Sequence, residues 1–568
     1  MLSSLEKHHK KQYYGKIRTL HKMKNLGGTM SANILRGTLL LTGASFLSKL
    51  LGMLYVIPFE NIVKEEGMAL YSFAYVPYTI FLSISTIGIP LAVSKFVSKY
   101  NAIDDYYTSK RMFQSGIILM FCTGFLAFLI MFFGAETIAR WTIAESNKNF
   151  SILDAKQVIQ MVSFSLLIIP GMAVVRGFFQ GNQSMGPTAI SQVVEQIARI
   201  IFLLVAVFII VVLLDGSITT AVGFATFSAF IGGIASWIVL GIYWKQRKQY
   251  INEKIEQQKR KEYIPTKTLF KELLSYAGPF VLVGIAIPLY QIIDQFTYSH
   301  AMASVGLGDI WEIAYSSFNM QGHKLVIIPV TVATGLSLAL VPEITKSFNI
   351  SNKTQLTQQI NQAFQIILFF VLPAIVGLML LSYPAYGALF GLETIAISGP
   401  LLTWYAPVAL FFALFTVSAA ILQGIEKQRF TLISLSAGIL LKILFNTLFI
   451  QTFGANGAII ATMLGTLVAV SLNLWKIKSS INFSYKQTIK RGILMLIFTS
   501  FMALVIVIVK WVLGFWISYD ESRLHALTYL LLGVGIGGMT YLWLGYASTL
   551  FERVVDRKIG FLDRIFRR

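Results

Sequence analysis

Apolar runs of roughly 20 residues recur along the whole chain, separated by short polar segments. A helix of that length crosses a hydrocarbon core of about 30 Å. The pattern therefore predicts an all-α polytopic membrane protein with fourteen transmembrane helices. The expected spans are 36–59, 71–97, 112–134, 157–181, 188–214, 219–244, 272–298, 313–341, 360–382, 400–423, 430–450, 455–475, 492–514 and 524–549.

The composition agrees with this prediction, because 55% of the residues are hydrophobic and only 13% are charged. Soluble domains carry about 25% charged residues. Lys and Arg gather in alternate loops, which the positive-inside rule assigns to the cytoplasmic side. We therefore expect a multi-pass protein of the cytoplasmic membrane, with both termini and the loop 245–271 in the cytoplasm. This topology accounts for the formal charge of +21 without a nucleic-acid partner.

Two pairs of segments echo each other and predict an internal duplication. The segment 178–202 recurs as 421–445 at an offset of 243, which aligns Arg199 with Lys442. A second echo has an offset of 247. Two nearly equal offsets imply two six-span repeats in the same orientation, and such transporters bind substrate between their halves. The matching pairs are Gln180/Gln423, Gly181/Gly424, Thr188/Thr431, Ile190/Ile433, Ser191/Ser434, Gly88/Gly335, Leu91/Leu338, Ala92/Ala339 and Lys99/Lys346.

The repeats, the charged segments and the last two spans divide the chain into six expected regions. These are a basic cytoplasmic tail (1–32), an N-lobe with six spans (33–245), a cytoplasmic linker (246–271), a C-lobe with six spans (272–476), a region with two extra helices (477–551) and a cytoplasmic C-terminal tail (552–568).

Four cations lie near the middle of apolar spans: Lys49, Arg199, Lys324 and Lys442. A charge at mid-bilayer costs about 2.5–3.5 kcal/mol on insertion scales, so four cost on the order of 12 kcal/mol. Buried positive charge suits an anionic ligand in a water-filled path. Lys49 and Lys324 have no acidic neighbour in sequence, and we expect these two to bind that ligand.

Two acids accompany these cations. Glu195 and Arg199 are four residues apart and share a helix face, which predicts a structural ion pair. Arg199 and Lys442 are aligned by the repeat, which favours a shared architectural role for them. Asp294 is interpreted either as a counter-ion for a cavity lysine or as a proton or sodium site.

The sequence contains no sign of catalysis. There is no phosphate-binding P-loop, no nucleophile beside a base and no metal-ligand spacing among the six histidines. We expect no enzyme activity, cofactor or metal. A transporter without a nucleotide site must use an ion gradient, the membrane potential or the substrate gradient.

Four motifs carry a resemblance to a known family, and they lie at 46–59, 85–102, 176–200 and 322–348. The chain resembles the multidrug/oligosaccharidyl-lipid/polysaccharide exporter superfamily over about residues 33–550. Within it, the resemblance is closest to the MurJ family of lipid II flippases in its Gram-positive form.

The resemblance implies that undecaprenyl-pyrophosphate-linked lipid II moves from the inner to the outer leaflet by alternating access, for peptidoglycan synthesis and cell shape. It implies a cationic cavity between the lobes and a lipid-tail groove formed by the last two spans. The family's cavity bases fall on Lys49 and Lys324 by motif position, and an arginine of some members falls on Tyr55. Because of that departure, Arg176 and Arg199 are further candidates for the cavity charge.

Three alternatives remain open. The first is a flippase for another lipid-linked oligosaccharide, of teichoic acid, capsule or spore wall. The second is a cation-coupled multidrug exporter, which would favour acidic rather than basic cavity residues. The third is a non-transporting scaffold that recruits cell-wall synthases. The expected partners are lipid II or a related undecaprenyl-linked glycolipid, membrane lipids and wall synthases.

Overall fold

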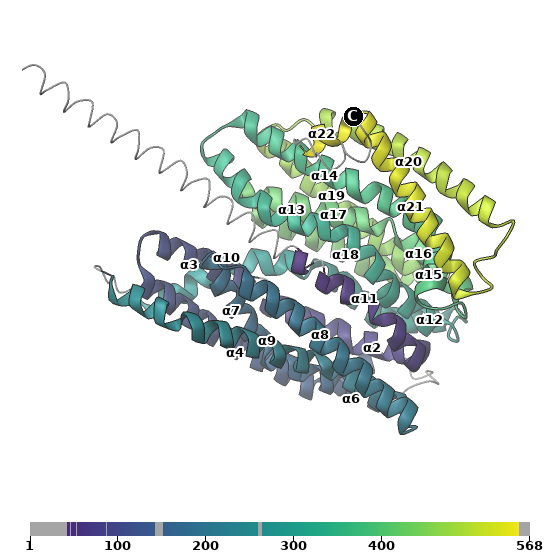
Figure 1. The fold of residues 1–568 in the computed structure, drawn as a ribbon, viewed down its shortest axis with the longest axis horizontal. Coiled ribbons are helices and arrows are strands. Elements are labelled where there is room, and N and C mark those ends of the chain that lie inside the picture. The colour runs from purple at the N-terminus through teal and green to yellow at the C-terminus, as the bar shows by residue number, and fades with distance from the viewer. Residues whose placement is uncertain are drawn as a thin grey trace, which may run out of the picture.

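A computed structural model describes residues 43–555 except 46, 53, 87, 143–150 and 259–263. The expected basic tail 1–32 and most of the tail 552–568 lie outside these residues. Within them the chain is helical and forms no strand, which confirms the expected all-α class. Figure 1 shows the helices as two groups of long, roughly aligned rods.

The helices of the first half are α2 (Val56–Thr86), α3 (Gly88–Ala102), α4 (Tyr106–Phe133), α5 (Ala135–Thr142), α6 (Ile152–Ser163), η1 (Phe164–Leu167), α7 (Ile169–Gly181), α8 (Gly186–Phe208), η2 (Ile209–Leu213) and α9 (Ile218–Glu256). The helices of the second half are α10 (Thr266–Gly284), α11 (Ala286–Ser304), α12 (Trp311–Ser316), η3 (Ser317–Gly322), α13 (His323–Asn349), α14 (Lys353–Leu380), α15 (Ser382–Leu389), α16 (Ile395–Tyr405), α17 (Val408–Gly424), α18 (Gln428–Phe453), η4 (Gly454–Asn456), α19 (Gly457–Ile481), α20 (Lys486–Leu513), α21 (Arg523–Ala547) and α22 (Leu550–Val555).

Polar residues between the apolar runs start several of these helices. The side chains of Asp105, Ser217, Asn352 and Ser522 each accept a hydrogen bond from a backbone N–H three residues later. Such caps satisfy donors that the first helical turn leaves unpaired. The polar segments that separate the apolar runs therefore also determine where these helices begin.

Eleven described helical segments are long and apolar enough to cross a membrane. One of them, Gln428–Ile481, contains two helices, because α18 and α19 pack against each other and the chain reverses at Gly454, where φ is 59°. The helices α10 to α13 are not among the eleven. The multi-span prediction is confirmed, and the count of fourteen stays a prediction.

Two close helix contacts are equivalent under the sequence echoes. A Cβ built on Gly181, at the end of α7, would lie 2.6 Å from the Ser94 carbonyl oxygen on α3. A Cβ built on Gly424, at the end of α17, would lie 2.7 Å from Cβ of Ile344 on α13. Gly181 and Gly424 are a matched pair of the first echo, and α3 and α13 carry the second. The helices that carry the two echoes thus pack in the same way in both halves: α7 packs on α3, and α17 packs on α13.

Substituting either glycine by alanine will destabilise its helix contact. We expect Gly181→Ala and Gly424→Ala each to lower the free energy of unfolding by about 1–3 kcal/mol, because overpacking forces neighbouring atoms to shift. The measurement is thermal unfolding of the purified protein in detergent. Gly377→Ala on α14 is the control, since its Cβ would meet nothing within 4 Å. Equal stability of all three variants would contradict the packing argument.

At one end of the molecule, here called the linker end, the segment between α9 and α10 contacts α4, and the ends of α3 and α7 contact each other. Arg111 on α4 donates a hydrogen bond to the Ile264 carbonyl oxygen at 2.6 Å, and Asn101 donates to Asn182 at 2.9 Å. The helix α10 packs on α3, where a Cβ on Gly88 would lie 2.6 Å from the Ala277 carbonyl oxygen. The two halves of the chain therefore touch across the expected lobe boundary.

The halves also meet at the opposite end. Phe73 on α2 stacks on Tyr315 with ring centroids 4.9 Å apart, and its carbonyl oxygen accepts a hydrogen bond from Gln295 at 2.8 Å. Gln321 on η3 donates to the Glu60 carboxylate at 2.7 Å. The two halves of the chain thus contact each other both at the linker end and toward the opposite end.

Candidate functional site

Four polar side chains form a continuous hydrogen-bonded chain where the two halves meet, and we call them the central chain. Arg199 on α8 donates to the Tyr71 hydroxyl on α2 at 3.0 Å. The Tyr71 and Tyr55 hydroxyls lie 3.3 Å apart, and Lys324 on α13 donates to the Tyr55 hydroxyl at 3.2 Å. Two cations from different halves are thereby linked through two phenols.

Spacing along α2 explains the Arg199 end of the central chain. Tyr71 and Tyr75 are four residues apart, so they share one helix face, and their rings stack with centroids 5.3 Å apart. Arg199 also donates to the Tyr75 hydroxyl at 3.2 Å. The planar guanidinium presents donors in a fixed fork, which two adjacent hydroxyls match.

The central chain contains two basic side chains and no acidic one. The Lys324 ammonium lies 4.4 Å from the centroid of the Tyr55 ring, and the Arg199 guanidinium lies 5.3 Å from that of Tyr75. Aromatic faces and neutral hydroxyls attract cations without cancelling their charge. Within the central chain, the hydrogen-bond acceptors of both cations are thus phenols rather than carboxylates.

Lys49 lies apart from the central chain on the first span. Ser45 donates to the Gln192 side chain at 3.2 Å, and Ser48 donates to its carbonyl oxygen at 3.4 Å, so this face of the span packs on α8. The Lys49 side chain is exposed. It precedes Tyr55 by six residues, or about 9 Å along a helix, toward the linker end.

The expected ion pair between Glu195 and Arg199 does not form. Glu195 instead accepts a hydrogen bond from Arg176 on α7 at 2.7 Å, and both side chains are largely buried. Arg176 also donates to Ser191 and to Ser236, each at 2.9 Å. A pair within one helix contributes only about 0.2–0.5 kcal/mol, so a partner on another helix with added hydroxyl acceptors displaces it.

Arg176 therefore differs from the cations of the central chain. Its charge is matched by Glu195 and its hydrogen bonds join α7, α8 and α9. The structure does not bring Arg176 into the central chain, although sequence reasoning grouped it with Lys324 and Arg199.

Lys442 is completely buried and paired with Asp294. Its ammonium donates to the Asp294 carboxylate at 2.6 Å, to the Ala458 carbonyl oxygen at 2.8 Å and to the Thr462 hydroxyl at 2.6 Å. Asn446 donates to the same carboxylate at 3.0 Å. These groups come from α11, α18 and α19. Asp294 is thus the counter-ion of Lys442, and the lysine occupies three oxygen acceptors within one half of the molecule.

The repeat partners Arg199 and Lys442 consequently have different surroundings. Arg199 contacts the phenols of α2, whereas Lys442 contacts a carboxylate on α11. The alignment of two basic residues in the echo does not imply the same role for both.

Sequence reasoning missed the tyrosines of the central chain and the buried acid Glu60. Tyr55 was noted only as a departure from the family pattern. Glu60 follows the first expected span by one residue, so it was assigned to a loop, yet only 5% of its surface is exposed. His323, beside Lys324, forms a hydrogen bond with the Tyr405 hydroxyl at 2.9 Å, which connects the first residue of α13 to the last residue of α16.

Known proteins resemble this chain over most of its length. The model of the polysaccharide biosynthesis protein family matches residues 34–348. Lipid II flippase MurJ of Bacillus subtilis (strain 168) is 44% identical over 539 residues, which cover 94% of this chain and 99% of that protein. The chain belongs to the MurJ family.

Solved structures support the same fold. A lipid II flippase MurJ in an inward closed conformation matches with a TM-score of 0.63 at 19% identity, over 91% of this chain and 100% of that one. An inward-facing multidrug resistance transporter of the MATE family matches with a TM-score of 0.62 at 16% identity, over 76% and 94% of the two chains. At 19% and 16% identity, these two matches show a shared fold and nothing more.

Tyr55 connects the two halves of the chain. Its hydroxyl accepts the hydrogen bond from Lys324. A tyrosine adds no charge of its own but positions the ammonium of a neighbouring helix. Lys324 and Arg199 thus lie at the two ends of a phenolic bridge, and Lys49 lies toward the linker end.

Proposed function

We propose that this chain is a flippase for lipid II, the undecaprenyl-pyrophosphate-linked peptidoglycan precursor, in the cytoplasmic membrane. The observation that carries the proposal is the central chain, where Lys324 and Arg199 have phenolic rather than acidic partners. Membership of the MurJ family supports the choice of substrate. Lys324, Arg199 and Lys49 bind the pyrophosphate, while Arg176 and Lys442 hold helices together.

Transport proceeds by alternating access between an N-lobe of six spans and a C-lobe of six. The contacts of α10 on α3 at the linker end, and those of Phe73, Tyr315 and Gln321 at the other, open in turn. The linker end and both termini face the cytoplasm, as the distribution of basic loops predicts. The pair α20 and α21 forms the groove for the isoprenoid tail, and α20 exposes large apolar side chains along its length.

The membrane potential favours this direction of transport. A pyrophosphate carries about two negative charges, and moving one charge across 100 mV changes the free energy by about 2.3 kcal/mol. An inside-negative potential drives this anion outward, so the movement lowers the free energy by on the order of 5 kcal/mol. We assign Asp294 and Glu195 as counter-ions rather than coupling sites, because each is already paired with a cation.

Depletion of the protein in living cells tests the substrate. We expect the amount of lipid II exposed on the outer leaflet to fall, while lipid II accumulates inside. Unchanged exposure would refute the proposal. Accumulation of another lipid-linked sugar would instead identify the protein as a flippase for that oligosaccharide. A scaffold without transport activity predicts that variants lacking the charge of Lys49 or Lys324 keep full function.

Removing the bridging hydroxyl tests the central chain. We expect Tyr55→Phe to slow the appearance of lipid II on the outer leaflet by roughly 10- to 150-fold, because Lys324 loses the acceptor that positions it. A hydrogen bond to a charged group contributes about 1.5–3 kcal/mol, and each 1.4 kcal/mol corresponds to a factor of ten. Tyr298→Phe, a buried tyrosine outside the central chain whose hydroxyl bonds to Ala455, is the control. A rate for Tyr55→Phe equal to that of the control would show that the bridge has no role.

A further inference from the structure

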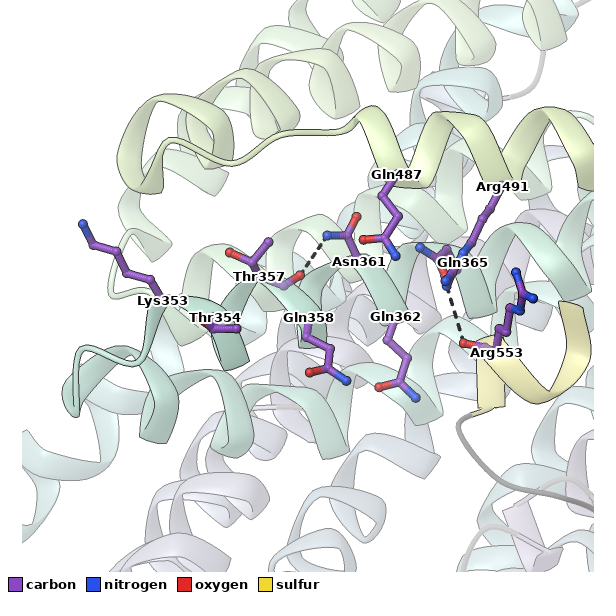
Figure 2. A pocket seen from close by; sticks show the side chains of 10 residues that line it. All are labelled: Lys353, Thr354, Thr357, Gln358, Asn361, Gln362, Gln365, Gln487, Arg491 and Arg553. Carbon is purple, nitrogen blue, oxygen red and sulfur yellow. Dashed lines mark hydrogen bonds between the residues drawn. The ribbon is translucent and has the colours of Figure 1, made fainter.

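The buried acid Glu60 lies close to the central chain, unlike the polar pocket among α14, α20 and α22. Figure 2 shows that pocket, whose described lining includes Arg491 and Arg553 but no member of the central chain. Glu60 lies on α2 and accepts a hydrogen bond from Gln321 on η3. A fixed negative charge thus lies beside the cations that are proposed to bind a substrate anion.

Two contacts between the same pair of helical segments lie about one helical turn apart. The Phe59 N–H donates to the Tyr55 carbonyl oxygen at 3.1 Å, so the helix that carries Tyr55 continues through Glu60. Glu60 is five residues beyond Tyr55, or about 7.5 Å along this helix, in the direction away from the linker end. Gln321 precedes Lys324 by three residues and shares a helix face with it. The Glu60–Gln321 contact therefore lies beyond the Tyr55–Lys324 contact, nearer the end opposite the linker.

Gln321 is fixed on its own half of the molecule. It is fully buried, and its side-chain oxygen accepts a hydrogen bond from the Tyr386 hydroxyl on α15. Its amide nitrogen therefore faces Glu60, to which it donates at 2.7 Å. Because Glu60 belongs to the first half of the chain and Gln321 to the second, separation of the halves at this end breaks the hydrogen bond.

Electrostatic forces favour an approach of Lys324 to Glu60. The carboxylate of Glu60 attracts the Lys324 ammonium, and the Arg199 guanidinium repels it. A lysine ammonium sits on a flexible four-carbon stem, so it can change partners without a movement of its helix. An anion bound to both cations would hold Lys324 in the central chain. Without that anion, both forces favour a contact of Lys324 with Glu60.

We propose that Glu60 releases the substrate anion, because its carboxylate replaces the pyrophosphate as the partner of Lys324 when the contact with Gln321 opens. This inference rests on the proposed function and assigns a residue to its last step. While the end opposite the linker is closed, Gln321 donates to Glu60 and the pyrophosphate occupies the central chain. Opening of that end removes the Gln321 donor, and a buried carboxylate that loses a donor is stabilised by a nearby cation. Closure restores the Gln321 contact and returns Lys324 to the central chain.

Glu60→Gln tests this role, because it keeps an oxygen acceptor for Gln321 and removes the charge. We expect the intact variant in detergent to bind lipid II about 10-fold more tightly than the unmodified protein, since no carboxylate competes for Lys324. The appearance of lipid II on the outer leaflet should slow by about 10-fold, because release is impaired. A tenfold change corresponds to about 1.4 kcal/mol. Damage to the fold would weaken binding, so tighter binding with slower transport distinguishes a role in release from a structural one.

The matched control is Glu66→Gln, which removes the same charge from an exposed position on α2 and should change neither quantity. In a Lys324→Gln background, Glu60→Gln should leave the affinity for lipid II unchanged, because the shared partner is absent. A tenfold gain that persists in that background would overturn the competition for Lys324.

Unchanged or weaker binding of lipid II by Glu60→Gln, with normal binding by the unmodified protein, would overturn the proposed role of Glu60 and leave the flippase proposal standing. Absence of lipid II binding by the unmodified protein would refute the flippase proposal, and the role of Glu60 with it.

Discussion

Lys442→Met is expected to lower the free energy of unfolding by about 3–5 kcal/mol, the usual cost of removing one partner from a buried ion pair. The substitution leaves the Asp294 carboxylate buried without its cation. It also removes the donor to Ala458 and Thr462. Thermal and denaturant unfolding of the purified protein will measure the loss. Lys427→Met at an exposed position is the control and should change stability little.

The double variant Lys442→Met with Asp294→Asn separates the two contributions. It removes both charges, so most of the lost stability should return, because neutral replacements of a buried pair are often well tolerated. Equal destabilisation in the single and double variants would show that packing, rather than charge, is what Lys442 supplies. Recovery would support the assignment of Asp294 as a counter-ion within one half of the molecule.

Lys324→Glu should abolish the ability of the protein to support growth when the native copy is depleted. The substitution places a negative charge at the meeting point of the two halves, where it repels a pyrophosphate and leaves the Arg199 end of the central chain alone. We expect outer-leaflet exposure of lipid II to fall by at least about 100-fold, which corresponds to roughly 3 kcal/mol. Lys49→Glu should have the same result.

Protein levels in the membrane must be measured beside growth, since an unfolded variant would also fail. Lys427→Glu provides a control, because it reverses the same charge at an exposed turn. Full growth of cells carrying Lys324→Glu at normal protein levels would refute its role in anion binding. Full growth with Lys49→Glu alone would confine that role to the central chain.

The helical class and most of the spans could be predicted from the sequence, because they depend on local properties. An apolar run of sufficient length must satisfy its backbone hydrogen bonds internally, and a helix does so. The echo around Gly181 and Gly424 was equally informative. Its two glycines make equivalent close approaches to α3 and α13, which only residues without a side chain permit.

The assignment of partners to charges was less successful. Spacing along one helix predicted an ion pair between Glu195 and Arg199. The prediction was wrong, because Arg176 on α7 forms the ion pair with Glu195. Lys442 and Asp294 are 148 residues apart, and no local pattern connects them. Glu60 was missed because a span boundary is uncertain by a few residues.

By itself, the sequence determined that the chain is an all-α membrane protein of the MurJ family with several cations buried in its spans. Those properties follow from length, hydropathy and motifs, which are read along the chain. Only the tertiary structure decided which cations are neutralised. Arg176 and Lys442 meet carboxylates from other helices, whereas Arg199 and Lys324 meet phenols. That distinction depends on side chains brought together from distant helices, because electrostatic interactions between charges depend on distance in space rather than along the sequence.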